Sequence, residues 1–393
     1  MSLDADQSSL GSPRDLPTTS EAAVGGSQLD ENVHADDESG FSRVRGANKK
    51  TKEYALERSV EFRRLQELRK KGWESTEGDE HFKKQRNTAD KASDKNARYF
   101  YRMVQTIGKD LHRFAKAFNI QRETDQPAIL DMCMAPGGFV AYCLTKYPNA
   151  RVKALSLPVE QGGHEVFLEH ANVQVEFLDV TMLAGDMGIT GDDIPAEHPD
   201  TRSFLLEKKF LEGEKFDLAL CDGQVLRTHE RLEWREPNEA RRLTTTQLAL
   251  SLEHLRQGGT MVILLHKLEA WGSLKLLNTL SKFSNVKVFK HRQHHAMRSS
   301  FYAIAKNVQA DSELAARAVA EWKREWRIAS LGTSDECAKA FQADSEDAEQ
   351  LLDEFGERMI VLGKVVWSTQ ATALERASFM KRAQGSVTKN SGD

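Results

Sequence analysis

Residues 131–139 read DMCMAPGGF and directly follow the apolar run Ala-Ile-Leu. An acidic residue, Asp131, therefore stands where a short apolar stretch gives way to a loop of small residues with adjacent glycines. Glycine lets a backbone approach a ligand closely, because it has no Cβ atom. The spacing G-x-G-x-x-G, which dinucleotide-binding loops use for pyrophosphate, is absent here.

Two interpretations of this loop compete. An isolated Gly-Gly pair is more often a plain turn, but the strand pattern around this pair favours a ligand-binding loop. A ligand without phosphate that carries an amino-acid end and an adenosine end needs an acid for its ammonium group and backbone groups for its carboxylate. Asp131 and residues 135–138 suit that ligand.

The surrounding pattern alternates short apolar runs with helical stretches. The apolar runs are residues 128–132, 152–157, 173–178, 216–221, 260–266, 286–289 and 301–305. The helical stretches are residues 138–147, 238–257 and 271–283. Such alternation predicts an α/β fold with a parallel, doubly wound sheet, which binds ligands at the carboxyl ends of its strands. The segment 181–215, rich in Gly and Pro, predicts a loop with a short helix.

The rest of the chain divides by composition. Residues 1–45 predict a disordered acidic tail, and residues 46–120 predict a basic helical extension with helices at 50–71 and 96–118. Residues 43–116 hold 21 Lys and Arg against 11 Asp and Glu, which fits either a polyanion contact or a charged, solvated helix. Residues 121–309 form the α/β domain, and residues 310–393 form a helical extension in which a Trp pair indicates packing.

Four blocks in this order resemble one family. DMCMAPGGF is similar to the D-x-x-x-A-P-G-G-F/W signature of the FtsJ-like (RrmJ-type) methyltransferases. FDLALCDGQ, LTTTQLALSLEHLRQGGTMVILLHK and RSSFYAIAKN resemble three further blocks of that family, and the segments around CDGQVLRTHER and LLHKLEAWGSLKLL are most similar to fungal members. The resemblance implies a Rossmann-like fold, S-adenosylmethionine as cofactor and methylation of ribose 2′-hydroxyls in RNA.

The same resemblance implies a set of cofactor contacts. They are Asp131, Ala135, Pro136, Gly137, Gly138, Phe139, Leu157, Asp179 and Asp222. Within this set, Asp179 resembles the acid that contacts the adenine amino group. Leu157 lies where the family places residues near the ribose and adenine.

The family's catalytic set is Lys-Asp-Lys-Glu, and this chain matches half of it. Asp222 corresponds to the aspartate and Lys267 to the central lysine, which acts as the general base or its close partner, because a ribose hydroxyl is a very weak acid. Arg102 stands where the first lysine is expected, so the resemblance implies that Arg102 or the nearby Lys109 holds the substrate. Phe301 replaces the glutamate.

Two further segments carry basic and aromatic residues. Residues 225–242 hold five arginines with interleaved acids, which fits either an RNA-gripping loop or an internally salt-bridged helix. Residues 287–298 form a basic patch with three histidines, which is consistent with polynucleotide binding. No acid stands among those histidines, so a metal site is not expected.

The composition limits the remaining function classes. Four cysteines without C-x-x-C spacing indicate a reduced intracellular compartment, cytoplasmic or nuclear, and no apolar run is long enough to span a bilayer. We therefore expect an S-adenosylmethionine-dependent methyltransferase that acts on RNA. The alternatives are a methyltransferase for a small molecule or a protein, and a module that binds S-adenosylmethionine or RNA without catalysis because the glutamate is missing.

Overall fold

The computed structural model describes residues 44–74, 80, 94–120 and 124–380. Nearly all of the predicted acidic tail lies outside the described residues. Within them, no helix has both the length and the apolar character needed to cross a membrane.

A seven-stranded sheet forms the centre of the molecule. Its strands are β1 (Ala128–Asp131), β2 (Arg151–Ser156), β3 (Val173–Phe177), β4 (Phe216–Cys221), β5 (Leu255–His266), β6 (Asn285–Phe289) and β7 (Ser300–Val308). The spatial order is β3-β2-β1-β4-β5-β7-β6. All seven predicted strands are confirmed, with shifted ends. The order reverses between β1 and β4, which is the switch point where such sheets bind ligands.

The prediction of an all-parallel sheet is wrong for β7, which runs antiparallel to both β5 and β6. The reason is the short connection from β6 to β7, which contains no helix. A parallel connection requires a crossover of a dozen or more residues, whereas a shorter one joins antiparallel strands.

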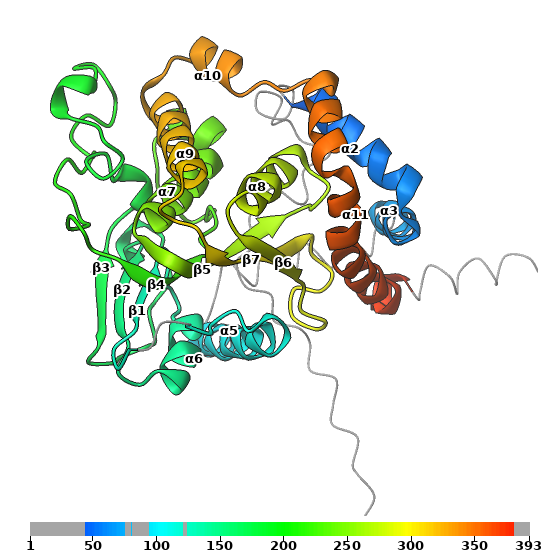
Figure 1. Ribbon diagram of the computed structural model, residues 1–393, viewed down its shortest axis with the longest axis horizontal. Helices are drawn as coiled ribbons and strands as arrows, with labels where there is room; N and C mark the ends of the chain where they lie inside the picture. Colours follow the sequence, from blue (N-terminus) through cyan, green and yellow to red (C-terminus); the bar gives the residue numbers. More distant parts are fainter. Residues whose placement is uncertain (1–43, 75–79, 81–93, 121–123, 381–393) are drawn as a thin grey trace, which may run out of the picture.

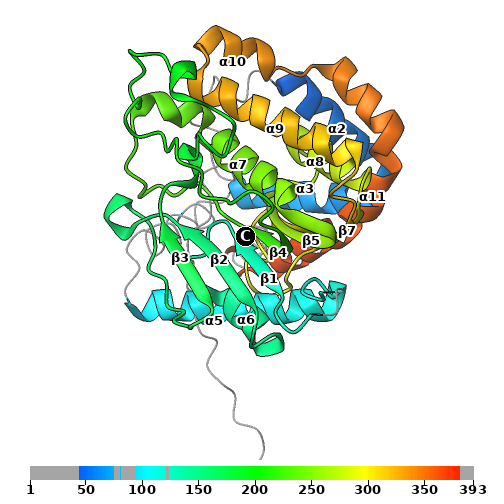
Figure 2. The same cartoon turned by 60° about the vertical axis from the view of Figure 1, so that its left-hand side comes forward.

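Helices cover both faces of the sheet (Figures 1 and 2). One face carries α5 (Asp94–Ala115) and α6 (Gly138–Lys146), and the other carries α7 (Glu239–Glu253), α8 (Trp271–Ser281) and α9 (Glu313–Leu331). Successive strand residues point to opposite faces, so Ile129 packs in the α5 and α6 core whereas Leu130 packs in the other. Burial on both faces explains why the strands are continuous apolar runs.

Short 3-10 turns occupy the connections. They are η2 (Val159–Gln161), η3 (Val180–Met182), η4 (Gly191–Asp193) and η5 (Glu233–Asn238). The predicted loop at 181–215 is confirmed, with η4 as its short helix. The Trp pair of α9 is buried as predicted, and Trp326 Nε1 donates a hydrogen bond to the Thr181 carbonyl at 3.1 Å. α9 therefore anchors the loop after β3.

The predicted helix at 50–71 is two helices, α2 (Arg45–Arg58) and α3 (Val60–Trp73). Ser59 separates them with an extended backbone, and its hydroxyl accepts a hydrogen bond from the Phe62 N–H at 3.1 Å. Serine is a preferred N-cap residue because its side chain satisfies one of the free N–H groups of the first turn. The cap therefore fixes where α3 begins.

The N-terminal and C-terminal extensions pack against each other. α2 and α3 lie along α11 (Ser345–Arg376), which follows the short α10 (Ser334–Ala340) (Figure 1). The ring of Phe62 lies 4.8 Å from that of Trp367, and both side chains are fully buried. Arg69 donates to Glu269 at 2.7 Å, which ties α3 to the segment after β5. Part of the basic charge of this extension is thus paired within the protein.

Candidate active site

The loop after β1 begins at the buried Asp131, whose Oδ1 accepts a hydrogen bond from the Cys133 N–H at 3.2 Å. Gly137 adopts a left-handed backbone with φ of 97°, which favours glycine. A Cβ at Gly138 would lie 2.7 Å from the Tyr101 carbonyl oxygen of α5. Both glycines are therefore required by the turn and by helix packing, in addition to any ligand.

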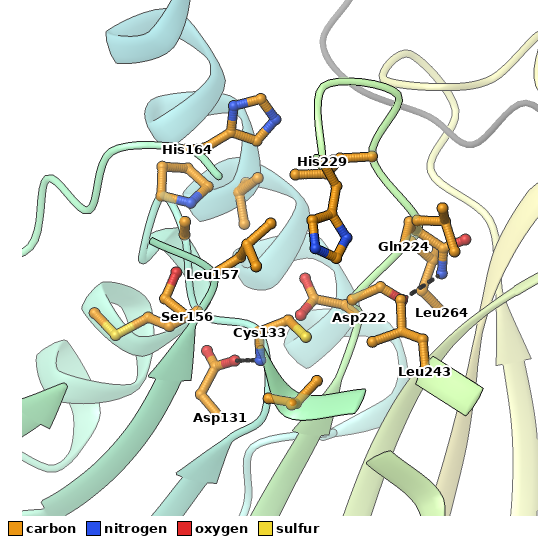
Figure 3. Close-up of a pocket in the computed structure, with 18 of the residues that line it drawn as sticks. Asp131, Cys133, Ser156, Leu157, His164, Asp222, Gln224, His229, Leu243 and Leu264 are labelled. Carbon is orange, nitrogen blue, oxygen red and sulfur yellow. Dashed lines mark hydrogen bonds between the residues drawn. The ribbon is translucent and has the colours of Figure 1, made fainter. Parts of the chain in front are cut away.

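A pocket that is partly open to solvent lies at the carboxyl ends of the strands. Figure 3 shows the Asp222 side chain between Cys133 and His229, with Asp131 below them. The lining includes the predicted cofactor contacts Asp131, Ala135, Pro136, Gly138, Phe139, Leu157, Asp179 and Asp222. Gly137 is the one member of the predicted set that does not line it. The structure thus brings nearly all of these residues together.

Asp131 and Asp222 make this pocket electrostatically suited to a cation. Burial and then the Asp222 charge raise the pKa of Asp131 well above its ordinary value. Burial also raises the pKa of Asp222 to about 7. Two carboxylates in one buried site favour neutral forms unless a positive group enters between them. An ammonium or sulfonium group would remove that cost, so the residues present fit S-adenosylmethionine.

Asp179 has a second role that its position in the sequence did not indicate. Its Oδ1 accepts from the Thr181 hydroxyl at 2.8 Å and backbone N–H at 3.0 Å, and its Oδ2 accepts from Arg235 at 2.6 Å. Burial works against ionisation, but Arg235, His229 and Thr181 together outweigh it, and the pKa of Asp179 is lowered. The predicted adenine contact is therefore an ionised side chain that protein donors already hold in place.

The arginine-rich segment 225–242 is mainly a salt-bridged structure, so the structure favours the second of its two interpretations. Arg235 and Arg242 are buried, and both bond Glu239, at 2.7 and 2.9 Å. Trp234 Nε1 donates to Asp200 at 3.0 Å. Arg235, Arg242 and Trp234 are therefore paired within the protein and are not presented to RNA.

Asp179, His229 and Glu239 place atoms that could bind a metal within 4.8 Å of one another. Arg235 bonds the carboxylates of both Asp179 and Glu239, so these groups are already neutralised by a protein cation.

Lys267 directly follows β5 at the same edge of the sheet. Its backbone is left-handed, with φ of 44°, and its N–H donates to the Ser299 carbonyl at 3.2 Å. Among the described residues that line the pocket, Lys267 does not occur, whereas Asp222 does. Of the two matched catalytic residues, the structure thus places only Asp222 in the pocket wall.

Phe301, which replaces the family glutamate, is buried in the core on the α7 and α8 face. The next residue, Tyr302, points to the other face and lines the pocket. Burial and the nearby Asp222 raise the pKa of Tyr302. Because strand side chains alternate, no side chain at position 301 reaches the pocket from this register.

Arg102 and Lys109 lie on the exposed side of α5, whereas Phe100 and Val104 of the same helix line the pocket. Arg102 and Lys109 lie two and nine residues after Phe100, which places them about 200° and 180° from it around the helix axis. This placement does not support the predicted contact of Arg102 or Lys109 with the reacting group.

The predicted basic patch at 287–298 is wrong for Lys290. This side chain is buried, and its ammonium donates to the carbonyls of His295, Arg298 and Ser300 at 3.2, 2.6 and 2.7 Å. His291 Nε2 lies 3.2 Å from Asp110. Lys287 and Arg292 are exposed. The contacts of Lys290 and His291 therefore stabilise the β6–β7 connection.

Several pocket residues were not predicted from the sequence. Cys133, Ser156 and Gln224 lie at a strand end or within three residues of one. That position alone could have predicted from the sequence that they line the pocket. His164 and His295 come from irregular loops, where no periodic pattern predicts which way a side chain points.

The pattern of strands, loop and carboxylates agrees with the comparison with known families. The sequence model of the FtsJ-like methyltransferases matches residues 110–308, which is just over half of the chain. No curated protein sequence matches the chain.

Three solved structures that match part of the chain share little sequence with it. A putative ribosomal RNA methyltransferase from Plasmodium falciparum is 14% identical with a TM-score of 0.34, over 52% of this chain and 97% of that one. An rRNA methylase from Streptococcus thermophilus is 12% identical with a TM-score of 0.29, over 51% and 96%. Human methyltransferase-like protein 13, in complex with S-adenosylhomocysteine (SAH), is 12% identical with a TM-score of 0.29, over 56% and 91%. The chain belongs to the FtsJ-like methyltransferase family and uses S-adenosylmethionine as its cofactor.

Proposed function

We propose that this protein methylates ribose 2′-hydroxyl groups of RNA. S-adenosylmethionine supplies the methyl group as an activated sulfonium. Asp131 binds the ammonium group, the loop at 135–138 holds the carboxylate end, and Leu157 and Asp179 lie beside the adenosine. These roles are supported by the pocket lining, which includes Asp131, Ala135, Pro136, Gly138, Leu157 and Asp179.

On the acceptor side, Asp222 and Lys267 carry the chemistry. The hydroxyl oxygen forms the new O–C bond as the S–C bond breaks, and the sulfur keeps that electron pair. Lys267, as general base or its close partner, takes up the hydroxyl proton, and Asp222 tunes it. Such transfer depends mostly on holding two reactants in line. Both residues follow strand ends at the same edge of the sheet.

The observation that favours RNA is a basic stripe on α5. The stripe consists of the exposed residues Lys95, Arg98, Arg102, Lys109 and Arg113. At 3.6 residues per turn, these positions fall within about 60° of one another around the helix. The other side of α5 lines the pocket through Phe100 and Val104. A row of exposed cations on a helix that also lines the pocket can bind the phosphate backbone of an RNA whose ribose enters that pocket.

This basic stripe gives Arg102 and Lys109 a different role from the one expected. They contact phosphates next to the pocket and do not touch the reacting hydroxyl. Arg98 also lies over the Phe167 ring at 5.2 Å, and the Phe167 N–H donates to the Pro136 carbonyl at 3.1 Å. The stripe is therefore connected to the loop that follows β1.

The test is transfer of tritiated methyl from S-adenosylmethionine to total RNA, followed by alkaline hydrolysis. Alkali cleaves RNA through its free 2′-hydroxyls, so a 2′-O-methyl group leaves label in alkali-resistant dinucleotides, whereas base methylation leaves it in mononucleotides. We expect resistant dinucleotides with the wild-type protein and at least a roughly 100-fold lower rate with Lys267→Ala or Asp222→Asn. Label in mononucleotides, in protein or in small molecules would reject the proposed acceptor.

A further inference from the structure

The pocket contains an unpaired polar atom that none of the predicted roles uses. Nε2 of His295 is buried and has no hydrogen-bond partner among the described residues. His295 lines the pocket together with Asp222, Leu264 and Tyr302. Leaving such an atom unpaired destabilises the folded protein, unless a ligand completes the hydrogen bond.

The backbone around His295 is held firmly. His295 has a left-handed φ of 54°, which is uncommon for a residue other than glycine. The Arg298 N–H donates to the His295 carbonyl at 3.1 Å, and the buried Lys290 ammonium donates to the same carbonyl at 3.2 Å. Lys290 also binds the carbonyls of Arg298 and Ser300. These contacts fix the backbone from which the imidazole projects, before any ligand arrives.

The chemical state of the ring limits what it can do. Burial first, and then the charges of Arg298 and Lys290, lower the pKa of His295 to about 3. The imidazole is therefore neutral near pH 7, and one ring nitrogen carries a lone pair. A neutral ring can accept a hydrogen bond from a hydroxyl, but it is too weak a base to keep the proton.

The location of His295 indicates which ligand it meets. The proposed cofactor contacts Asp131, Leu157 and Asp179 follow or end β1, β2 and β3. His295 belongs to the β6–β7 connection, and its pocket neighbours Leu264 and Tyr302 belong to β5 and β7. These strands lie on the other side of β4, at whose end Asp222 stands. His295 therefore faces the acceptor side of the pocket.

We propose that Nε2 of His295 accepts a hydrogen bond from the acceptor hydroxyl and so positions its oxygen for methyl transfer. Before transfer, an attacking hydroxyl directs a lone pair at the methyl group, so its hydrogen must point to another acceptor. Once the O–C bond forms, the oxygen is strongly acidic, and its proton leaves the hydrogen bond to His295 for Lys267, the base of the proposed function. His295 supplies that acceptor on the pocket wall, where Phe301 leaves none. This inference rests on the proposed function, because it requires a hydroxyl as the acceptor.

The test compares three variants of His295 that differ in the atom they place near the position of Nε2. His295→Gln keeps an amide oxygen near the Nε2 position, His295→Asn places its amide near Nδ1, and His295→Leu removes the polar atom. We expect His295→Gln to retain transfer to total RNA within about tenfold, whereas His295→Asn and His295→Leu lose roughly 10- to 100-fold in kcat. His294→Gln, at the neighbouring histidine outside the pocket lining, serves as control and should transfer normally.

Two binding measurements separate this role from loss of folding. Calorimetry should give the same Kd for S-adenosylmethionine in all variants, within about threefold. With SAH present, wild-type protein should bind a random RNA 12-mer pool more tightly than the same pool with 2′-fluoro groups, which cannot donate a hydrogen bond. His295→Leu should bind both pools equally.

The outcomes distinguish the two proposals. If wild-type protein transfers methyl to RNA and His295→Leu transfers equally well, the role of His295 is rejected and the proposed function stands. If His295→Leu fails to bind S-adenosylmethionine and His295→Gln does not restore transfer, the residue is structural and the role is also rejected. If wild-type protein methylates no RNA hydroxyl, both proposals fail together.

Discussion

Asp131 and Asp222 come from neighbouring parallel strands and meet in one pocket. Asp131 pairs in register with Leu220 of β4, and Asp222 lies two residues further along the same direction. Both carboxylates have raised pKa values, and the charge of Asp222 contributes to the shift of Asp131. Without a cationic ligand, these two acids therefore favour their protonated forms.

This pair makes cofactor binding depend on pH. Because the folded-state pKa of Asp222 is raised to about 7, its stabilising effect is present at low pH and is lost as pH rises from about 4 through about 7. A cationic ligand reverses this, since it binds the ionised form. We expect S-adenosylmethionine to bind roughly tenfold more tightly at about pH 7.5 than at about pH 5.5. Calorimetry at both pH values would measure this difference in affinity for S-adenosylmethionine.

The matched variant is Asp222→Asn, which removes one titrating group and keeps the shape of the side chain. Because Asp131 still titrates in this variant, its affinity should keep a pH dependence in the same direction, but a weaker one than that of the wild type. An unchanged pH dependence in Asp222→Asn would show that other groups cause it.

The basic stripe on α5 predicts a specific dependence on salt. A protein that neutralises phosphates of single-stranded RNA loses affinity with a slope of about −0.7 per cation in log K against log salt. The double variant Arg102→Ala and Lys109→Ala should therefore reduce the slope by roughly 1.4. Fluorescence anisotropy with a labelled RNA pool from about 50 to 200 mM salt gives this number.

Arg324→Ala provides the control for that experiment. Arg324 is exposed on α9, which covers the opposite face of the sheet from α5 (Figure 1). The slope of log K against log salt for Arg324→Ala should equal that of the wild type. An equal loss in Arg324→Ala and in the double variant would indicate nonspecific charge effects, and the basic stripe would no longer support RNA as the acceptor.

Glu239 compensates two buried arginines, and its neutralisation should be costly. Glu239→Gln leaves the charges of Arg235 and Arg242 without their shared carboxylate, so we expect a loss of about 3–5 kcal/mol in the free energy of unfolding. Urea denaturation followed by circular dichroism would measure it. Glu313→Gln breaks an exposed pair with Arg317 at the same i, i+4 spacing and should change little.

Phe62 joins the two terminal extensions. Phe62→Ala removes a fully buried ring that packs on Trp367, so we expect a loss of about 3–5 kcal/mol. Val60→Ala, on the same helix but 67% exposed, should change stability by less than about 0.5 kcal/mol. Thermal melting of both variants checks this, and similar melting temperatures would mean that α3 contributes little to the fold.

The sequence by itself determined the seven strands and most of the pocket loop. Buried strands are continuous apolar runs, and polar residues at their ends, such as Asp131 and Asp222, must meet at one edge of the sheet. That rule is local along the chain and needs no knowledge of distant contacts.

Only the tertiary structure decided which polar groups are free to act. In the sequence, Arg235 and Lys290 both read as exposed cations. In the structure, Arg235 is buried against Asp179 from another segment, and Lys290 is buried against carbonyls of its own irregular loop. The direction of Arg102 depends on how α5 packs on the sheet, and the position of His295 depends on carbonyl contacts within an irregular loop. Charge and residue type are local properties, whereas burial and pairing arise from contacts between distant parts of the chain.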